Sequence, residues 1–517
     1  MDRLDTSPTG EEKGRPKGDQ YTYEEAEKDP NLHKGTASEE GDTDGVFIYS
    51  AEEERRVKRK IDLILLPLLC MCYVFSFLDK TLLNYSSIFG IKTALHLTGS
   101  DYSWLGSAFY LGYIVGALMW AKLVQRWPQH VGKFISGAVT VWACITLLTP
   151  LCYNFVGILI VRLFLGLVES IIGPVFVIVT SKWWTRSEQA FRTAFWLGGT
   201  PIGNFCGGLI SYGLGSMHPS FPTWKLFFVF FGALGLAYAV VLSLLMPDTQ
   251  ANARWLTPKE RRISADRVRA NHTGNSNTNE WKWPQFWEAL RDPQTTMFFV
   301  TAVGNTMPST FASMFSSQIV SGFGFSTLET TIVSTCPAAV IQLSTFLVFS
   351  YIASHRPNIR LGLSMLVSVP PLIGASLLHA LPLENRAGRL AGYYLTYTHT
   401  MSFTLNTSLM ASNYAGNTKK ATANGVIFAG WAAGLVAGPQ FFLDSQAPVY
   451  ELAFRMLMGT YALMIIVPCF QLAWYNYENR RREQLSTGRH HPGQAGGEDE
   501  DDDRTDFEQW ETFRYVM

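Results

Sequence analysis

Long apolar segments of roughly 20 residues, separated by polar loops, limit the possible folds of this sequence more than any other feature. A helix of that length spans the ~30 Å hydrocarbon core of a bilayer. Lipid offers no hydrogen-bond partners for backbone N–H and C=O groups, so each segment must be helical. The sequence therefore predicts an all-α integral membrane protein.

The apolar segments number about twelve, with six on each side of a polar stretch. The first six lie near residues 61–90, 104–124, 132–152, 155–180, 193–215 and 224–246. The second six lie near residues 295–320, 328–353, 360–380, 389–413, 419–441 and 450–474. The predicted domains are an N-terminal tail at 1–60, a six-helix half at 61–247, a middle loop at 248–293, a second six-helix half at 294–475 and a C-terminal tail at 476–517.

Lysine and arginine residues concentrate in alternate connections between the segments. They lie at Arg55 to Lys60, Arg126 and Lys133, Lys182 to Arg192, the middle loop, Arg356 and Arg360, Lys419 and Lys420, and Arg480 to Arg482. Cytoplasmic loops carry such an excess, so we expect both termini and the middle loop to be cytoplasmic. Arg386 and Arg389 are exceptions to the alternation. The formal net charge of zero says little about partners, because the charges are sorted by membrane side.

The two tails are polar, and we expect most of them to be disordered. The first 60 residues contain no apolar stretch of the signal-peptide kind. Near the other end, the acidic run Glu498 to Asp503 is either a solvated, self-repelling segment or a partner-binding one. The seven cysteines show no ligand spacing, so we expect neither a metal site nor a disulfide framework. We also expect no cofactor and no nucleic-acid partner.

The arrangement of six segments, a charged loop and six segments predicts two repeated halves. The inner loops "QRWPQHVGK" and "SHRPNIRLG" occupy matching positions in the two halves. Such repeats favour a substrate site between the halves near mid-depth. The transmembrane part contains no GxxxxGK[ST] phosphate cradle and no nucleophile–base constellation. We therefore expect a secondary transporter and not an enzyme.

Two ionisable residues lie within the fourth apolar segment. Arg162 and Glu169 are seven residues apart, so on a helix they share a face and stand ~10 Å apart along the axis. Gly166 and Gly173 lie on the same side, while Leu, Ile and Val cover the rest. This face either holds a structural buried ion pair or couples transport to protons or substrate.

A further acid and base stand side by side in the first segment, in "FLDKTLLNY". On a helix Asp79 and Lys80 point ~100° apart, so each needs a separate partner. One can face Arg162 or Glu169 across a helix interface, and the other can face the cavity. The alternative is that the pair lies at the outer water boundary, ~28 Å along the helix from Ile61, with Lys80 reaching the surface.

The second half has neutral polar and aromatic residues in its seventh, tenth and eleventh segments. They are Asn305, Gln318, Tyr393, Tyr397, His399, Asn406, Asn424 and Trp431. Such side chains either shape a substrate pocket or hold helices together. We select Asn305, Tyr393, Tyr397 and Asn424 as substrate-binding candidates.

Several motifs together resemble the fungal allantoate permease family, anion:cation symporters of the major facilitator superfamily. They include "FSFLDKTLLNYSSIFG", "DYSWLGSAFYLGYIVG", "VRLFLGLVES", "NYAGNTKKATANGVIFAGWAAGLVAGPQFF" and the terminal "DRTDFEQWETFRYV". The resemblance covers roughly Ile61 to Tyr477 and the last dozen residues. One departure is the inner loop "AKLVQRWPQHVGK", which lacks the Asp that the superfamily normally places before its Arg.

The resemblance implies a major facilitator fold and proton-coupled uptake of a small carboxylate-bearing nutrient: a ureide, vitamin, dipeptide or sulfur compound. It implies that Asp79 and Glu169 carry protons, with Arg162 two turns before Glu169, and that Lys80 meets the substrate anion. Arg162 is a further substrate-binding candidate. We expect a plasma-membrane protein that functions as a monomer in the lipid bilayer, with a small organic anion and protons as its partners. The alternatives are export of a secondary metabolite and a nutrient sensor that does not transport.

Overall fold

The computed structural model describes residues 32–35, 47–217, 219–269, 281–356, 358–487 and 503–517. Most of the predicted N-terminal tail, and the acidic run apart from Asp503, lie outside these residues. Strand β1 (Leu32–Gly35) pairs antiparallel with β2 (Phe47–Ser50), and α2 (Ala51–Ile88) follows at once. The first helix therefore begins well before its apolar segment.

A capping box explains why α2 begins at Ala51. The Ser50 hydroxyl accepts a hydrogen bond from the Glu53 N–H at 3.2 Å, and the Glu53 carboxylate accepts one from the Ser50 N–H at 3.2 Å. Three glutamates in the first turn also complement the positive end of the helix dipole. The polar first turns of α2 thus form a helix that extends beyond the apolar part.

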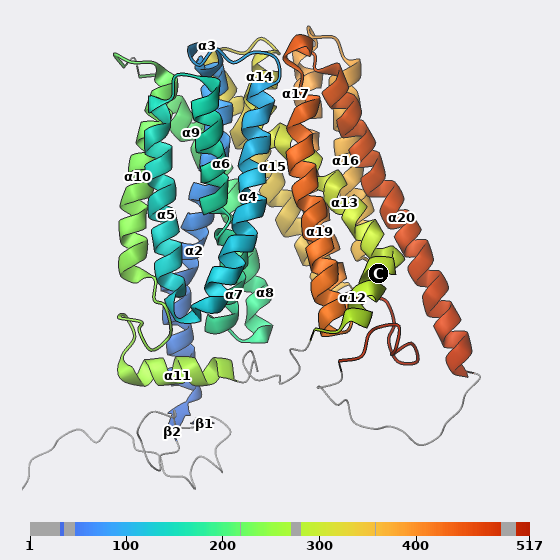
Figure 1. Cartoon of the computed structure of the whole chain (residues 1–517). Helices are drawn as coiled ribbons and strands as arrows, with labels where there is room; N and C mark the ends of the chain where they lie inside the picture. Colours follow the sequence, from blue (N-terminus) through green and yellow to red (C-terminus); the bar gives the residue numbers. More distant parts are fainter. Residues whose placement is uncertain (1–31, 36–46, 218, 270–280, 357, 488–502) are drawn as a thin grey trace, which may run out of the picture.

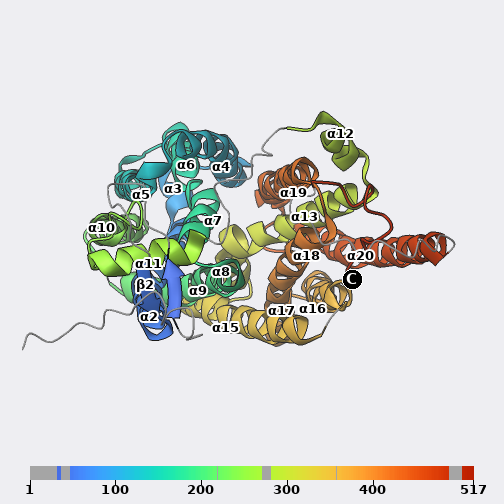
Figure 2. The same cartoon turned by 90° about the horizontal axis from the view of Figure 1, so that it is seen from below.

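Helices α2 to α11 form one bundle and α12 to α20 form a second bundle beside it (Figure 1). The first bundle continues with α3 (Ile91–Ala94), α4 (Asp101–Arg126), α5 (Val131–Leu148), α6 (Phe155–Glu169), α7 (Ile172–Trp183), α8 (Arg186–Leu197), α9 (Gly199–Gly215), α10 (Thr223–Leu245) and α11 (Pro258–Arg269). The second contains α12 (Trp283–Arg291), α13 (Pro293–Thr310), α14 (Ser316–Ser321), α15 (Thr327–His355), α16 (Arg360–Ala380), α17 (Arg386–Leu395), α18 (Thr400–Asn413), α19 (Asn417–Ala437) and α20 (Glu451–Thr487). In the view along the bundle axes, α4 and α19 face each other across the boundary between the bundles (Figure 2).

Nine helices in the described residues are long and apolar enough to cross a membrane. They are Ala51–Ile88, Asp101–Arg126, Pro128–Leu151, Phe155–Trp183, Thr223–Leu245, Thr327–His355, Arg360–Ala380, Asn417–Phe441 and Glu451–Ser486. The other three predicted segments are helical but short or interrupted. A π-helical turn at Phe311–Phe315 divides one of them, and a 3₁₀ turn at Thr396–His399 divides another. The count of twelve crossings stays a prediction.

Large apolar side chains cover the outside of both bundles. Leu118 is 66 % exposed and Phe470 is 65 % exposed, and many Val, Leu and Ile side chains share this position. A soluble protein rarely exposes so much apolar surface, whereas lipid solvates it favourably. The protein is therefore a multi-pass membrane protein.

Helices α11 and α12 and the end of α20 all lie at one end of the bundles, at the bottom of Figure 1. We call this the inner end, because the lysine and arginine pattern assigns its loops to the cytoplasm, and the opposite end the outer end. We expect protease added outside sealed cells to leave the middle loop around α11 intact and to cut it only after permeabilisation. Cleavage in sealed cells would contradict this orientation.

Candidate functional site

The side chains of Asp79 and Lys80 leave α2 in different directions and have different partners, as the sequence predicts. The Lys80 Nζ lies 2.9 Å from the Glu169 Oε1 of α6 and donates a hydrogen bond to the Ser76 Oγ at 3.2 Å. The Ser76 hydroxyl also donates to the Glu169 carboxylate. Ser76 thus lies one turn before Lys80 and joins it to the acid.

Glu169 is fully buried, whereas the Lys80 side chain is 25 % exposed. A buried carboxylate is costly unless it is paired and hydrogen-bonded, and Lys80 and Ser76 supply those contacts here. Within this pair, Lys80 is therefore the partly exposed residue and Glu169 the buried one.

Asp79 leaves α2 in a direction that brings its carboxyl group to α5 and α6. Its Oδ1 accepts a hydrogen bond from the Thr146 hydroxyl at 2.8 Å, and its Oδ2 lies 4.0 Å from the Arg162 Nη1. Both charged side chains are 4 % exposed. A cavity of about 20 Å³, lined by residues including Trp142 and Tyr238, adjoins the carboxyl group and is large enough for one water molecule. Asp79 and Lys80 thus pair with two different residues of α6, Arg162 and Glu169 respectively.

The buried contact with Arg162 gives Asp79 a testable structural role. Removing one partner of a buried ion pair costs roughly 3–5 kcal/mol, because the other charge stays uncompensated. We expect Asp79→Asn to lower the unfolding temperature of the purified protein, and Asp79→Asn with Arg162→Gln to restore part of it. A thermally normal Asp79→Asn variant that cannot accumulate substrate would instead identify Asp79 as a proton carrier.

Close packing of α4 against α6 brings aromatic rings to Lys80. A Cβ atom at Gly166 would lie 1.9 Å from the Phe109 carbonyl oxygen, and one at Gly112 would lie 2.0 Å from the Leu163 carbonyl oxygen. Only glycine permits this approach, which is typical of helix interfaces in membranes. The Lys80 Nζ consequently lies 5.8 Å from the ring centroids of both Phe109 and Tyr113.

The aromatic contacts continue from α4 into the second bundle. The Tyr113 ring lies 5.6 Å from the Trp431 ring of α19, and Trp431 stacks on Phe428 with centroids 5.3 Å apart. Lys80 therefore lies at one end of a row of contacting aromatic rings that extends from the first half into the second half. This position agrees with the predicted site between the two repeats.

The structure does not bring the second-half candidates to Lys80. Asn305 is buried and its amide donates to the His399 carbonyl at 3.1 Å. Tyr393 and Tyr397 share a hydrogen bond of 2.7 Å, and the Tyr393 hydroxyl donates to the Ser334 carbonyl at 2.6 Å. These three contacts join α13, α15, α17 and the turn before α18.

Asn424 is exposed on α19, one turn before Phe428 and two turns before Trp431. Residues at this spacing share a helix face, so Asn424 lies on the face that turns toward α4, nearer the inner end. It remains a candidate for contact with a substrate that enters or leaves by the inner end. Nothing in its position joins it to the Lys80–Glu169 pair.

The two halves are joined near the outer end by polar contacts. The Asn84 amide donates to the Ser316 Oγ at 2.8 Å, and the Ser317 N–H donates to the Asn84 Oδ1 at 3.0 Å. The Lys92 Nζ lies 2.8 Å from the Asp444 Oδ1. Tyr102, Ser103 and Ser107 of α4 add hydrogen bonds to carbonyl groups of the second half. The outer end is therefore closed.

The sequence did not single out four residues that contact the charged groups: Ser76, Thr146, Phe109 and Tyr113. Ser76 precedes Lys80 by one helical turn, and this spacing was an available signal. The spacing of Phe109 and Tyr113 around Gly112 was another, because it places two rings on one face beside a small residue. Thr146 carries no signal, since its role depends on how α5 packs against α2.

Comparison with known proteins identifies the superfamily to which this chain belongs. The sequence profile of the Major Facilitator Superfamily matches residues 69–439, and the chain belongs to this superfamily of secondary transporters. An uncharacterized transporter of Schizosaccharomyces pombe is 32 % identical over 91 % of this chain and 89 % of its own length. The allantoate permease of Saccharomyces cerevisiae is 30 % identical over 90 % of this chain and 87 % of its own length. The predicted resemblance to the allantoate permease family is thereby confirmed.

Solved structures show the same fold at low sequence identity. A bacterial homolog of the human lysosomal transporter Spinster, in an inward-facing and unoccupied conformation, aligns with a TM-score of 0.59 and 15 % identity. The alignment covers 82 % of this chain and 97 % of that protein. The all-helical major facilitator architecture predicted from the sequence is confirmed.

Proposed function

We propose that this transporter imports a small carboxylate-bearing molecule together with a proton across the plasma membrane. The observation that carries the proposal is the pairing of a partly exposed Lys80 with a fully buried Glu169. An ammonium in a low-dielectric site binds a carboxylate through strong charge-assisted hydrogen bonds. The same ammonium is already bound to a carboxylate of the protein, so substrate and Glu169 compete for it.

The charges around Lys80 provide a physical reason for coupling. Asp79 and Glu169 together balance Lys80 and Arg162 when all four are ionised. A proton on Glu169 gives this group a net positive charge and releases Lys80 from its counter-ion. An anion then binds without a second negative charge beside it. Deprotonation after release restores the Lys80–Glu169 pair and leaves the site neutral.

The contacts at the outer end correspond to one state of an alternating-access cycle. In this state the two halves are joined at the outer end by polar contacts. Transport by such repeats proceeds by rocking one half against the other around the site. The rings of Tyr113 and Trp431, one from each half, lie where that motion would open or close the path to Lys80.

The allantoate permease among the relatives favours a ureide as the first substrate to test. Vitamins, dipeptides and sulfur compounds that carry a carboxylate belong to the same test set. We place the protein in the plasma membrane and expect the monomer to be the functional unit. The test is uptake of labelled candidates into cells at several external pH values, followed by efflux from preloaded cells.

Uphill uptake that increases with external acidity is the expected outcome. Accumulation against a gradient only in the outward direction would identify an exporter instead. Saturable binding with no flux in either direction would identify a sensor. Each of the last two outcomes would contradict the proposal.

A further inference from the structure

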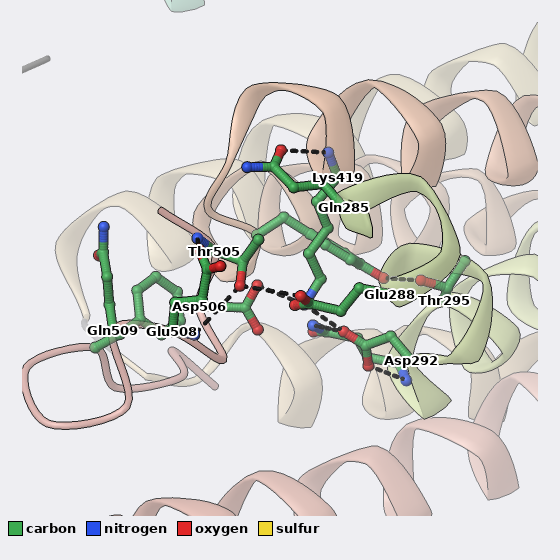
Figure 3. A network of polar contacts seen from close by, with 12 residues as sticks. Gln285, Glu288, Asp292, Thr295, Lys419, Thr505, Asp506, Glu508 and Gln509 are labelled. Carbon is green, nitrogen blue, oxygen red and sulfur yellow. Dashed lines mark hydrogen bonds and ion pairs between the residues drawn. The ribbon is translucent and has the colours of Figure 1, made fainter. Parts of the chain in front are cut away.

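The last fifteen residues of the chain, 503–517, lie against the inner end of the second bundle. Helix α20 ends at Thr487, so this segment returns to the bundle after residues 488–502. Figure 3 shows that it meets side chains from α12, the start of α13 and α19. The segment therefore bridges helix ends that are far apart in the sequence.

The first anchor of the segment is Lys419, whose side chain is completely buried. Its Nζ lies 2.9 Å from Glu288 of α12, 3.0 Å from Asp292 at the start of α13, and 2.7 Å from Asp506 of the segment (Figure 3). An ammonium has three N–H donors, and these three carboxylates match them. The ammonium also lies 3.7 Å from the centroid of the Phe507 ring.

The segment supplies a large share of the contacts that the Lys419 ammonium makes. Without residues 503–517, Lys419 would lose the Asp506 carboxylate and the Phe507 ring that covers it. Burial raises the pKa of the Asp292 carboxyl above its usual range, while Lys419 opposes that shift. The buried cluster of one lysine and three acids is thus completed only when the segment is in place.

The second anchor is Tyr515, which Arg482 of α20 holds. The Arg482 Nη2 donates to the Tyr515 hydroxyl at 2.9 Å, and that hydroxyl donates to the Asp506 Oδ2 at 2.7 Å. The Tyr515 ring stacks on Tyr475 of α20, with centroids 5.0 Å apart. Asp506 therefore connects both anchors, because its two oxygens serve Lys419 and Tyr515.

The third set of contacts recognises the backbone of the segment. Asn413, at the end of α18, accepts from the Val516 N–H at 2.7 Å and donates to the Val516 carbonyl at 2.8 Å. Asn479 of α20 does the same for Tyr515, with both distances at 2.9 Å. Hydrogen bonds to the main chain of a bound segment are typical of peptide-binding sites, and here two asparagine side chains supply them.

We propose that the inner end of the second half is a peptide-binding site whose ligand is the chain's own segment 503–517. Occupation of this site clamps the inner ends of α12, α13, α18, α19 and α20 together. The same α19 carries Lys419 at its inner end and Trp431 at the boundary between the halves. The clamp fixes the helix that faces α4. This inference does not depend on the identity of the substrate or on proton coupling.

The test uses the full-length protein with a specific protease recognition sequence placed between Gly493 and Gly497. After folding and purification, cleavage leaves a fragment that only non-covalent contacts hold. We expect the fragment to co-elute with the transporter in size-exclusion chromatography and to dissociate slowly. We also expect the unfolding temperature to fall once the fragment has been washed away.

Variants within the fragment separate specific binding from general attraction without altering the bundle. Asp506→Asn removes the charge that meets Lys419, and we expect it to increase the dissociation rate at least tenfold. Glu511→Gln removes the same charge at an exposed position and is the matched control. Immediate loss of the unaltered fragment, or equal dissociation rates for these two variants, would overturn the proposal.

Discussion

In cells that express Glu169→Gln, we expect the substrate to equilibrate across the membrane without accumulating against its gradient. Glutamine keeps the shape of the side chain and its contact with Ser76, but it cannot carry a proton. Lys80 then has no charged counter-ion to exchange for the substrate. Substrate exchange should survive in part, and substrate affinity should lose its dependence on pH, because no proton can bind at this position.

The measurement compares net uphill uptake with exchange of labelled for unlabelled substrate, at matched surface expression. Glu451→Gln is the control, because Glu451 is an exposed acid that pairs with Arg455 and lies far from the site along the chain. It should leave both activities unchanged. If Glu169→Gln accumulated substrate as the unaltered protein does, Glu169 would be a structural partner of Lys80 and no proton carrier.

The helical architecture follows from the sequence because lipid imposes a length and a composition on each crossing. The prediction was weakest where that signal is interrupted. The segment near 295–320 contains Pro308 and a π-helical turn, and the segment near 389–413 contains the turn at Thr396–His399. The early start of α2 depends on capping by Ser50 and Glu53. These residues are polar, so a search for apolar segments does not detect this helix start.

Part of the site could be predicted because neighbouring helical residues point in different directions. Separate partners for Asp79 and Lys80 followed from that geometry, and the structure supplies Arg162 and Glu169 respectively. The choice between these partners could not be predicted, because it depends on the rotation of α2 against α6. That rotation is set by contacts between helices that are far apart in the chain, and the residues of α2 alone do not reveal it.

For the second-half candidates, the sequence could not separate residues that bind substrate from residues that hold helices together. Tyr393, Tyr397 and Asn305 have the side chains of a binding pocket, yet their hydrogen bonds are satisfied by helices of their own half. A polar residue that joins helices and one that contacts substrate look alike in sequence. The C-terminal segment differs again, because its docking depends on long-range contacts with Lys419 and Arg482.

We expect Lys80→Gln to weaken substrate binding by about 30-fold or more. Truncating one partner of a buried, hydrogen-bonded charge pair costs roughly 2 kcal/mol or more, and that energy corresponds to this factor. Lys80→Ala should resemble Lys80→Gln. Lys80→Arg should keep partial function, because the charge survives while the wider planar group must fit between Phe109 and Tyr113. The measurement is concentration-dependent uptake at matched surface expression.

The double variant Lys80→Gln with Glu169→Gln separates the binding role of Lys80 from its structural role. In the single variant Glu169 stays buried without its cation, so part of any defect reflects instability. The double variant removes that uncompensated charge and should recover a normal unfolding temperature, yet still bind substrate weakly. If Lys80 only reached the outer surface, water would solvate its head group and all these changes would be nearly silent. Its 2.9 Å contact with Glu169 makes that outcome unexpected. Normal affinity in the double variant would exclude Lys80 from the substrate site.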